Sequence, residues 1–185
     1  ETIEIDESIS IVGNSSSTTN IIAGTEEYDS DNPYVVEITA ANVVLKNINF
    51  TATTSDFDIL YSYDADAISL LNNIFYYSSA DHSSTTTVKL KDGDNHIISE
   101  NIIYLGNQIL VMEGVSNSLV NNNHLSSTDS GASWEISGSD NNIIENNTLV
   151  DSWYGTWVSD SDYNTIRNNS FISNEGYPAI RLAEG

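Results

Sequence analysis

The chain of 185 residues contains no cysteine, only two prolines and only five lysine and arginine residues. Without cysteine, disulfide bonds and thiolate chemistry are excluded. The five cations stand against 27 aspartates and glutamates, which gives a formal net charge of −22. We therefore expect neither nucleic acid nor an anionic membrane surface as a partner, because both need a basic surface. The sequence also lacks any apolar run of about 18 residues, so we predict no membrane insertion, and no signal peptide is visible.

What the chain does contain is a repeat built around paired asparagines. The segment 141–149 (NNIIENNTL) recurs in similar form 22 residues later at 163–171 (YNTIRNNSF), and weaker copies lie upstream. Each copy ends in an apolar residue, and these residues are 22 to 28 positions apart: Phe50, Phe75, Ile103, Leu125, Leu149 and Phe171. A period in this range predicts a solenoid, in which each repeat buries its apolar face only against its neighbours.

Between the asparagine pairs, apolar residues alternate with polar ones, as in Val36 and Ile38 or in Trp134 and Ile136. A period of two predicts strands with one face inward, whereas leucine-rich and helical repeats need other spacings. Asn, Asp, Gly and Ser, which favour tight turns, separate these strands. The sequence therefore predicts an all-β fold, a single-stranded parallel β-helix of about seven rungs of 22–28 residues, forming one domain over 1–185.

The paired asparagines fall into two columns of the predicted stack. The first column needs the left-handed conformation of a turn, which asparagine tolerates, and it contains Asn72, Asn122, Asn146 and Asn168. Side chains of the second column would lie about 4.8 Å apart, a spacing at which identical amides hydrogen-bond into a ladder. We predict this structural ladder at Asn73, Asn101, Asn123, Asn147 and Asn169.

These repeats, with the opening segment 2–13 (TIEIDESISIVG), resemble the right-handed parallel β-helix superfamily. They are similar to NosD-like, carbohydrate-binding and sugar-hydrolase (CASH) repeats and to adhesin-like surface proteins of methanogenic archaea. The resemblance covers nearly the whole chain and implies a right-handed solenoid, but no particular activity, because the superfamily includes lyases, hydrolases, adhesins and phage tailspikes. Neither end of the sequence shows a cap, so we expect part of a longer chain or of an end-to-end assembly.

Acidic residues form two further columns just before the predicted turns. Stacked carboxylates repel one another unless a cation neutralises them, and calcium takes several oxygen ligands. Calcium is therefore the one cofactor we consider, with these candidate ligands: Asp64, Asp66, Asp92, Asp94, Asp140, Asp160 and Asp162. The alternative is that these acids form turns and face water, and no segment fits the EF-hand frame.

The three tryptophans lie close together in the sequence. Aromatic rings pack against the C–H faces of sugars, so Trp153, Tyr154 and Trp157 are candidates for glycan contact. The alternative is core filling, and the alternation predicts that Trp134 points inward.

Four asparagines begin N-glycosylation sequons, and they make the chain a candidate glycoprotein: Asn14, Asn49, Asn146 and Asn168. The turn column predicts that the side chains of Asn146 and Asn168 point outward. Three histidines, His82, His96 and His124, have no metal-binding spacing, and we place them in turns or on the surface.

The motifs of polygalacturonase-like hydrolases do not occur, and an acidic polysaccharide, as pectate lyases bind, would meet a like-charged surface. We predict no enzyme but a non-catalytic extracellular or cell-surface module, adhesin-like or structural, which can form filaments or a sheath through its β-helix ends. Its expected partners are other copies or cell-surface proteins and glycans. The alternative is a carbohydrate-binding or carbohydrate-active module, like a glycoside hydrolase or polysaccharide lyase, with acids from among Asp140, Glu145, Asp151 and Asp160.

Overall fold

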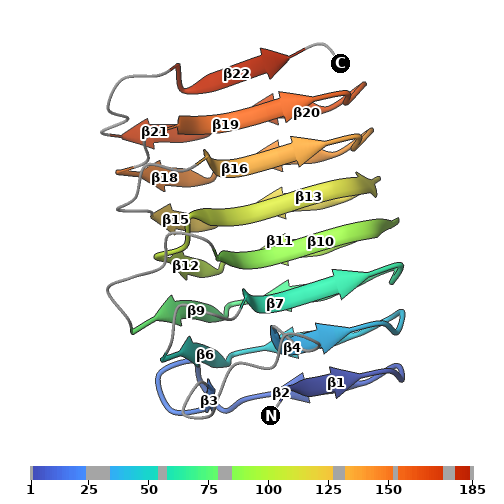
Figure 1. Cartoon of the computed structure of the whole chain (residues 1–185), viewed down its shortest axis with the longest axis vertical. Helices are drawn as coiled ribbons and strands as arrows, with labels where there is room; N and C mark the ends of the chain where they lie inside the picture. The colour runs from blue at the N-terminus through green and yellow to red at the C-terminus, as the bar shows by residue number, and fades with distance from the viewer. Residues whose placement is uncertain are drawn as a thin grey trace.

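The computed structural model of the chain describes residues 2–23, 34–53, 58–78, 85–126, 132–151, 154–172 and 178–183. Over these ranges the chain forms 22 β-strands and no helix. The strands stack into three parallel sheets around one elongated apolar core (Figure 1). In this part of the chain, no helical segment has the length and apolarity to cross a membrane.

Sheet 1 contains eight strands in the described ranges. In stacking order they are β1 (Ile3–Ile5), β4 (Tyr34–Ile38), β7 (Asp58–Tyr63), β10 (Thr86–Asp94), β13 (Gln108–Ser116), β16 (Ala132–Ser137), β19 (Tyr154–Ser159) and β22 (Ile180–Ala183).

Sheets 2 and 3 contain seven described strands each. The strands of sheet 2 are β2 (Ser10–Val12), β5 (Val44–Lys46), β8 (Ser69–Leu71), β11 (Ile97–Ser99), β14 (Leu119–Asn121), β17 (Ile143–Glu145) and β20 (Thr165–Arg167). Those of sheet 3 are β3 (Asn20–Ala23), β6 (Asn49–Ala52), β9 (Ile74–Tyr77), β12 (Ile102–Tyr104), β15 (His124–Ser126), β18 (Thr148–Val150) and β21 (Ser170–Ile172).

Each rung visits sheets 1, 2 and 3 in turn and pairs in parallel with the next rung. Val120 pairs with Ile144 in sheet 2, and Leu125 pairs with Leu149 in sheet 3, as the repeat predicts. The predicted all-β parallel solenoid is therefore confirmed. The number of rungs differs slightly from the predicted seven, because sheet 1 has one strand more than the other two sheets in the part of the chain described.

The core runs along the axis of the solenoid and consists of the inward-facing positions of all three sheets. Phe50 and Phe75, the repeat anchors in adjacent rungs, stack with ring centroids 5.0 Å apart and 8° between planes. Trp134 lies inside, 1% exposed, as the alternation predicts. Stacking identical positions in this way gives each rung apolar contacts above and below, which a single rung could not supply.

The turn between sheets 2 and 3 is made by one residue with left-handed backbone. The residues at this position in successive rungs have φ between 52° and 60°: Asn47, Asn72, Glu100, Asn122, Asn146 and Asn168. The predicted turn column is therefore confirmed, and asparagine recurs there because it adopts positive φ more readily than most residues. Since the turn has the same conformation in each of these rungs, the strands on both sides keep their register.

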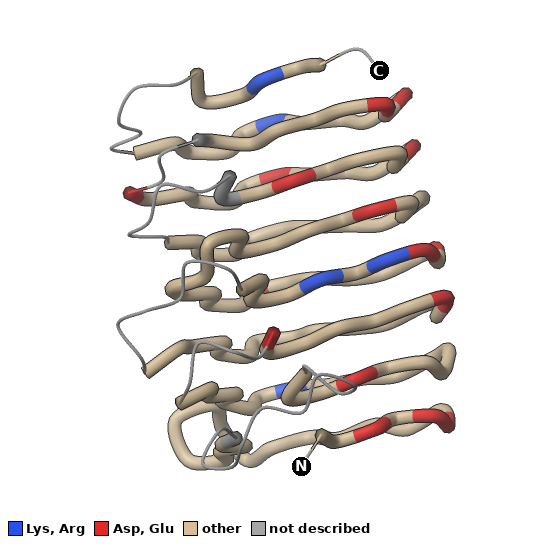
Figure 2. The backbone as a smooth tube through the Cα atoms, in the orientation of Figure 1, with Lys and Arg blue, Asp and Glu red and all other residues tan. Residues whose placement is uncertain are grey.

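Charge is unevenly distributed over the sheets. Figure 2 shows acidic residues along sheet 1 and at its right-hand edge, where the turns to sheet 2 lie. The strands of sheet 3 contain no Asp, Glu, Lys or Arg within their described bounds. The charged chemistry of the described surface is therefore concentrated on sheet 1 and on the turn that follows it.

Candidate functional site

The outer face of sheet 1 combines aromatic rings with three of the five cations of the chain. Its central column, read across the paired strands, is Glu37, Tyr61, Lys89, Val111, Glu135, Trp157 and Arg181. A second column, two residues further along each strand, is Tyr63, Lys91, Glu113, Ser137 and Ser159. We take this face as the candidate functional site.

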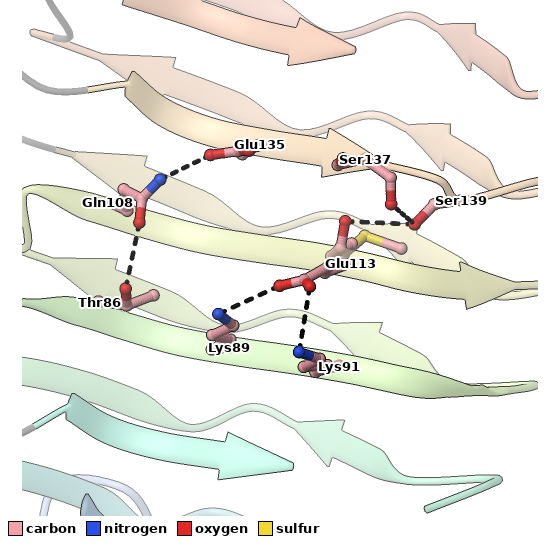
Figure 3. Close-up of polar contacts among 9 residues, drawn as sticks. Thr86, Lys89, Lys91, Gln108, Glu113, Glu135, Ser137 and Ser139 are labelled. Carbon is pink, nitrogen blue, oxygen red and sulfur yellow. Dashed lines mark hydrogen bonds and ion pairs between the residues drawn. The ribbon is translucent and has the colours of Figure 1, made fainter. Parts of the chain in front are cut away.

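An ion-pair cluster lies at the centre of this face (Figure 3). The Glu113 carboxylate on β13 contacts Lys89 Nζ and Lys91 Nζ on β10, each at 3.2 Å. Burial alone would raise the pKa of Glu113, but hydrogen bonds and charge from the two lysines outweigh it and lower that pKa. Sequence reasoning missed this cluster, although the Lys-x-Lys alternation in a predicted strand and an acid one repeat later indicate it.

A row of polar side chains crosses sheet 1 beside the ion-pair cluster (Figure 3). Thr86 Oγ1 donates to Gln108 Oε1 at 3.3 Å, and Gln108 Nε2 donates to Glu135 Oε2 at 2.6 Å. At the β7 end of the row, Asp58 Oδ1 accepts the backbone N–H of Thr86 at 2.6 Å. Burial raises the pKa of Asp58 to about 6, although this hydrogen bond and the charge of Lys89 act in the opposite direction.

Aromatic contacts flank the polar centre of the face. Tyr34 and Tyr61 stack with centroids 4.4 Å apart, and Arg181 lies over the Trp157 ring, 4.6 Å from its centroid. Of the three predicted glycan-contact residues, Trp157 lies on this face. Trp153 lies outside the described residues. Of Tyr154, the first residue of β19, only the backbone is described, so the place of its side chain is not given. Glycan contact therefore stays a prediction.

The seven predicted calcium ligands form two columns where sheet 1 leads into sheet 2, with Asp92 and Asp94 at the end of β10 and the other five just after strands of sheet 1. The column of Asp64, Asp92 and Asp160 has φ between 49° and 52°, and glycines with positive φ replace aspartate at Gly114 and Gly138. The backbone conformation explains this alternation of aspartate and glycine without any ion.

The other acidic column contains Asp66, Asp94, Asp140 and Asp162, and side chains of this column bind the next rung. Asp66 Oδ1 accepts the N–H of Asp94 at 2.8 Å, and Asp140 Oδ1 accepts the N–H of Asp162 at 2.6 Å. No group of three acidic or histidine side chains suited to a metal occurs in the described ranges. Calcium binding therefore stays a prediction. What the structure shows is that Asp66 and Asp140 bind the backbone of the next rung.

The five predicted ladder asparagines form one continuous column between sheets 2 and 3. Each side-chain Oδ1 accepts the backbone N–H of the equivalent residue one rung below, at 2.8–3.0 Å, at Asn73, Asn101, Asn123, Asn147 and Asn169. Each Nδ2 donates to a strand carbonyl of the rung below, as Asn123 does to Ile98 at 2.8 Å. These amides serve the stack, and they are not available to a ligand.

The four sequon asparagines lie in different environments. Asn146 and Asn168 are exposed turn residues with φ of 57° and 55°, and Asn14 is also exposed. Asn49, in contrast, donates from Nδ2 to Asn20 Oδ1 at 2.9 Å and is only half-exposed. Glycosylation stays a prediction at all four, and Asn49 is the least accessible of them.

The histidine prediction was wrong for His96, which is buried in the core with 1% of its surface exposed. His96 comes directly after Asn95, whose left-handed backbone turns the following side chain inward. His124 is partly exposed and contacts the Tyr104 ring edge-on at 5.9 Å. His82 lies outside the described residues.

The four acids considered for glycosidase chemistry do not converge on the outer face of sheet 1. Glu145 lies on sheet 2 and accepts a hydrogen bond from Arg167 Nε at 2.7 Å. Asp151 and Asp160 have left-handed backbone, and Asp140 binds the adjacent turn. The part of the chain described thus gives each of these acids a separate place in the stack.

Comparison with solved structures finds the Streptococcus pneumoniae surface protein and adhesin PfbA. The two chains are 10% identical in sequence and superimpose with a TM-score of 0.42, and the match covers 97% of this chain and 68% of that chain. A similarity this distant carries no inference about function. No curated protein matches the chain. The family described as the right handed beta helix region matches residues 34–180, most of the sequence. The chain therefore belongs to the right-handed β-helix family.

Proposed function

We propose that this chain is a non-catalytic, extracellular β-helix module of a surface or structural protein, which binds its partners through the outer face of sheet 1. The partners are cell-surface proteins or glycans, or further copies of the chain. One observation carries the proposal: partly exposed aromatic contacts flank a network of paired charges on an in-register sheet. Aromatic rings beside fixed polar groups are typical of recognition surfaces.

The engagement of the carboxylates supports binding rather than catalysis. Glu113 is held by two lysines, and Glu135 accepts a short hydrogen bond from Gln108. The two lysines lower the pKa of Glu113 and so stabilise its ionised carboxylate, whereas a general acid needs a pKa near the working pH. Glu113 and Glu135 are therefore suited to fixing the positions of neighbouring side chains.

A carbohydrate-active module is the second candidate function, and Asp58 is the observation that favours it. Its raised pKa of about 6 lies in the range in which a carboxyl group can act as a general acid, and Lys89 provides charge nearby. This alternative predicts products from a polysaccharide, whereas the binding module leaves its ligand intact.

The test combines binding and product analysis on the same ligands. The purified chain is applied to immobilised polysaccharides, cell-surface glycoproteins and the chain itself, and the soluble phase is analysed for new reducing ends. We expect binding without products, weakened about tenfold or more by Trp157→Ala. Tyr163→Asn is the matched control, because Tyr163 is 84% exposed in a turn position where other rungs have asparagine.

Two outcomes would contradict the proposal. Release of new reducing ends that Asp58→Asn abolishes would establish the carbohydrate-active alternative. Absence of binding to every ligand, or binding that Trp157→Ala leaves unchanged, would exclude the outer face of sheet 1 as the contact surface.

A further inference from the structure

Besides the asparagine ladder between sheets 2 and 3, another column of inward-pointing side chains follows the turn between sheets 1 and 2. Each member comes directly after a residue with positive φ, such as Asn95 or Asn117. From the N-terminal rung upward, the column contains Val43, Ile68, His96, Ser118, Asn142 and Asn164. The first two members are aliphatic and the next four are polar, so His96 lies where the column changes character.

Hydrogen bonds join the polar members of this column from rung to rung. Asn142 Oδ1 accepts the N–H of Ser118 at 2.9 Å, and Ser118 Oγ accepts the N–H of His96 at 2.9 Å. The lowest bond runs from the N–H of Ile68 to His96 Nδ1, at 3.2 Å. His96 therefore links the rung of β8 to the rung of β11 through a nitrogen that must be unprotonated to accept.

Protonation of His96 would remove this link and place a charge in the core. With a proton on Nδ1, two donors would face each other, and Nε2 is buried without a hydrogen-bond partner. Burial lowers the pKa of His96 to about 4, and the charges of Asp66 and Asp94, the acidic groups acting on the ring, offset only part of this effect. Serine and asparagine, which join the rungs above, do not titrate.

We propose that His96 makes the junction between the rungs of β8 and β11 an acid-sensitive joint, at which the solenoid opens before the rungs above it do. The ring binds a proton more weakly in the closed stack than in an opened one, whose histidine has the ordinary pKa of about 6.5. The closed junction is therefore fully stabilised above about pH 6.5 and loses stability as the pH falls towards 4.

Amide hydrogen exchange measured by NMR on the whole chain tests the joint. The Ile68 amide donates to His96 and therefore reports on the joint. The Ser118 amide, two rungs above Ile68, donates to Asn142 and reports on an equivalent bond that involves no histidine. Between pH 7 and pH 5, after correction for intrinsic exchange, we expect the protection of Ile68 to fall about tenfold or more, with Ser118 changing less than about twofold.

His96→Asn is the matched variant, because asparagine already occupies this column at Asn142 and Asn164. We expect it to keep the Ile68 amide protected at both pH values. Equal loss of protection along the whole stack, or an unchanged pH profile in His96→Asn, would overturn the proposal. So would an NMR titration of the His96 ring in the unmodified chain that gives a pKa near 6.5, a measurement that stands even if the variant does not fold.

Discussion

Neighbouring asparagines of the same pair have different physical roles. Asn122 has φ of 56°, is exposed, and supplies the backbone conformation of the turn. Asn123 is 2% exposed, and its amide binds the backbone of the rung below and the side chain of Asn147 in the rung above. One asparagine is therefore needed for its backbone and the next for its side chain.

This difference predicts unequal effects of substitution. Asn123→Ala leaves the Asn101 N–H without its acceptor, removes the amide donor to the Ile98 carbonyl and opens a cavity, so we expect it to lower the free energy of unfolding by about 2–4 kcal/mol. Asn122→Gly keeps the positive φ and should change the free energy of unfolding by less than about 1 kcal/mol. Chemical denaturation followed by circular dichroism measures both, and equal losses would contradict separate roles.

Asp58 has the opposite pH dependence from His96. Its pKa is raised to about 6 by burial, so its contribution to stability is present at acidic pH and is lost as the pH rises through 6. In the Asp58→Asn variant, the amide oxygen would keep an acceptor for the Thr86 N–H without the charge. We expect this substitution to raise the free energy of unfolding at pH 8 by about 1–2 kcal/mol, allowing for solvent screening, and to have a clearly smaller effect at pH 4.5, where the loss has only begun. Thermal unfolding at the two pH values measures this, and equal effects at both would contradict the raised pKa.

At the scale of elements, the long strands β10 and β13 hold the charges of sheet 1 in register. Lys89 pairs with Val111 and Lys91 with Glu113, so Glu113 lies beside one lysine and diagonal to the other. The two ion pairs follow directly from this register, and both are partly exposed. They consequently fix side-chain positions more than they stabilise the fold.

We therefore expect Glu113→Gln to lower the free energy of unfolding by no more than about 1 kcal/mol, with the difference disappearing in about 1 M salt. The same variant should weaken partner binding, because Lys89 and Lys91 lose their shared anchor. Glu37→Gln, on the same face in β4, is the control for removing one negative charge. A loss of several kcal/mol, or one that salt leaves unchanged, would show that the cluster is a structural requirement.

The turn between sheets 1 and 2 is the element that decides the calcium prediction. If its acids bind the ion, calcium at micromolar concentration should raise the unfolding temperature, and Asp94→Asn with Asp140→Asn should abolish the rise. Magnesium at the same concentration is the control. An equal rise with both ions would reflect screening of the net charge instead.

For the whole molecule, the repeat in the sequence was sufficient to predict the architecture. Asparagines at a constant offset from an apolar anchor imply a constant turn, and a constant turn between short strands leaves a parallel stack as the way to bury every anchor. Trp134 could be placed inside by alternation alone, and the turn column by the preference of asparagine for positive φ.

The candidate site could not be predicted to the same extent. The cluster around Glu113 depends on which rungs meet across sheet 1, and insertions of unequal length hide that register in the sequence. His96 was misplaced because its column contains several different residue types, Ile, His, Ser and Asn among them, so no repeated letter marks it. Chemically diverse columns are thus harder to detect than uniform ones.

The uniform turn also makes the length of the protein an adjustable quantity. Deleting residues 119–142 would join Ser118 to Ile143, which occupy consecutive positions of the repeat in adjacent rungs, because Ile143 is the equivalent of Leu119. Asn101 would then bind Asn147, and Ser118 would bind Asn164, each replacing a partner of identical type. We expect such a chain to fold into a rod shorter by about 4.8 Å, so evolution could set the reach of this scaffold one coil at a time.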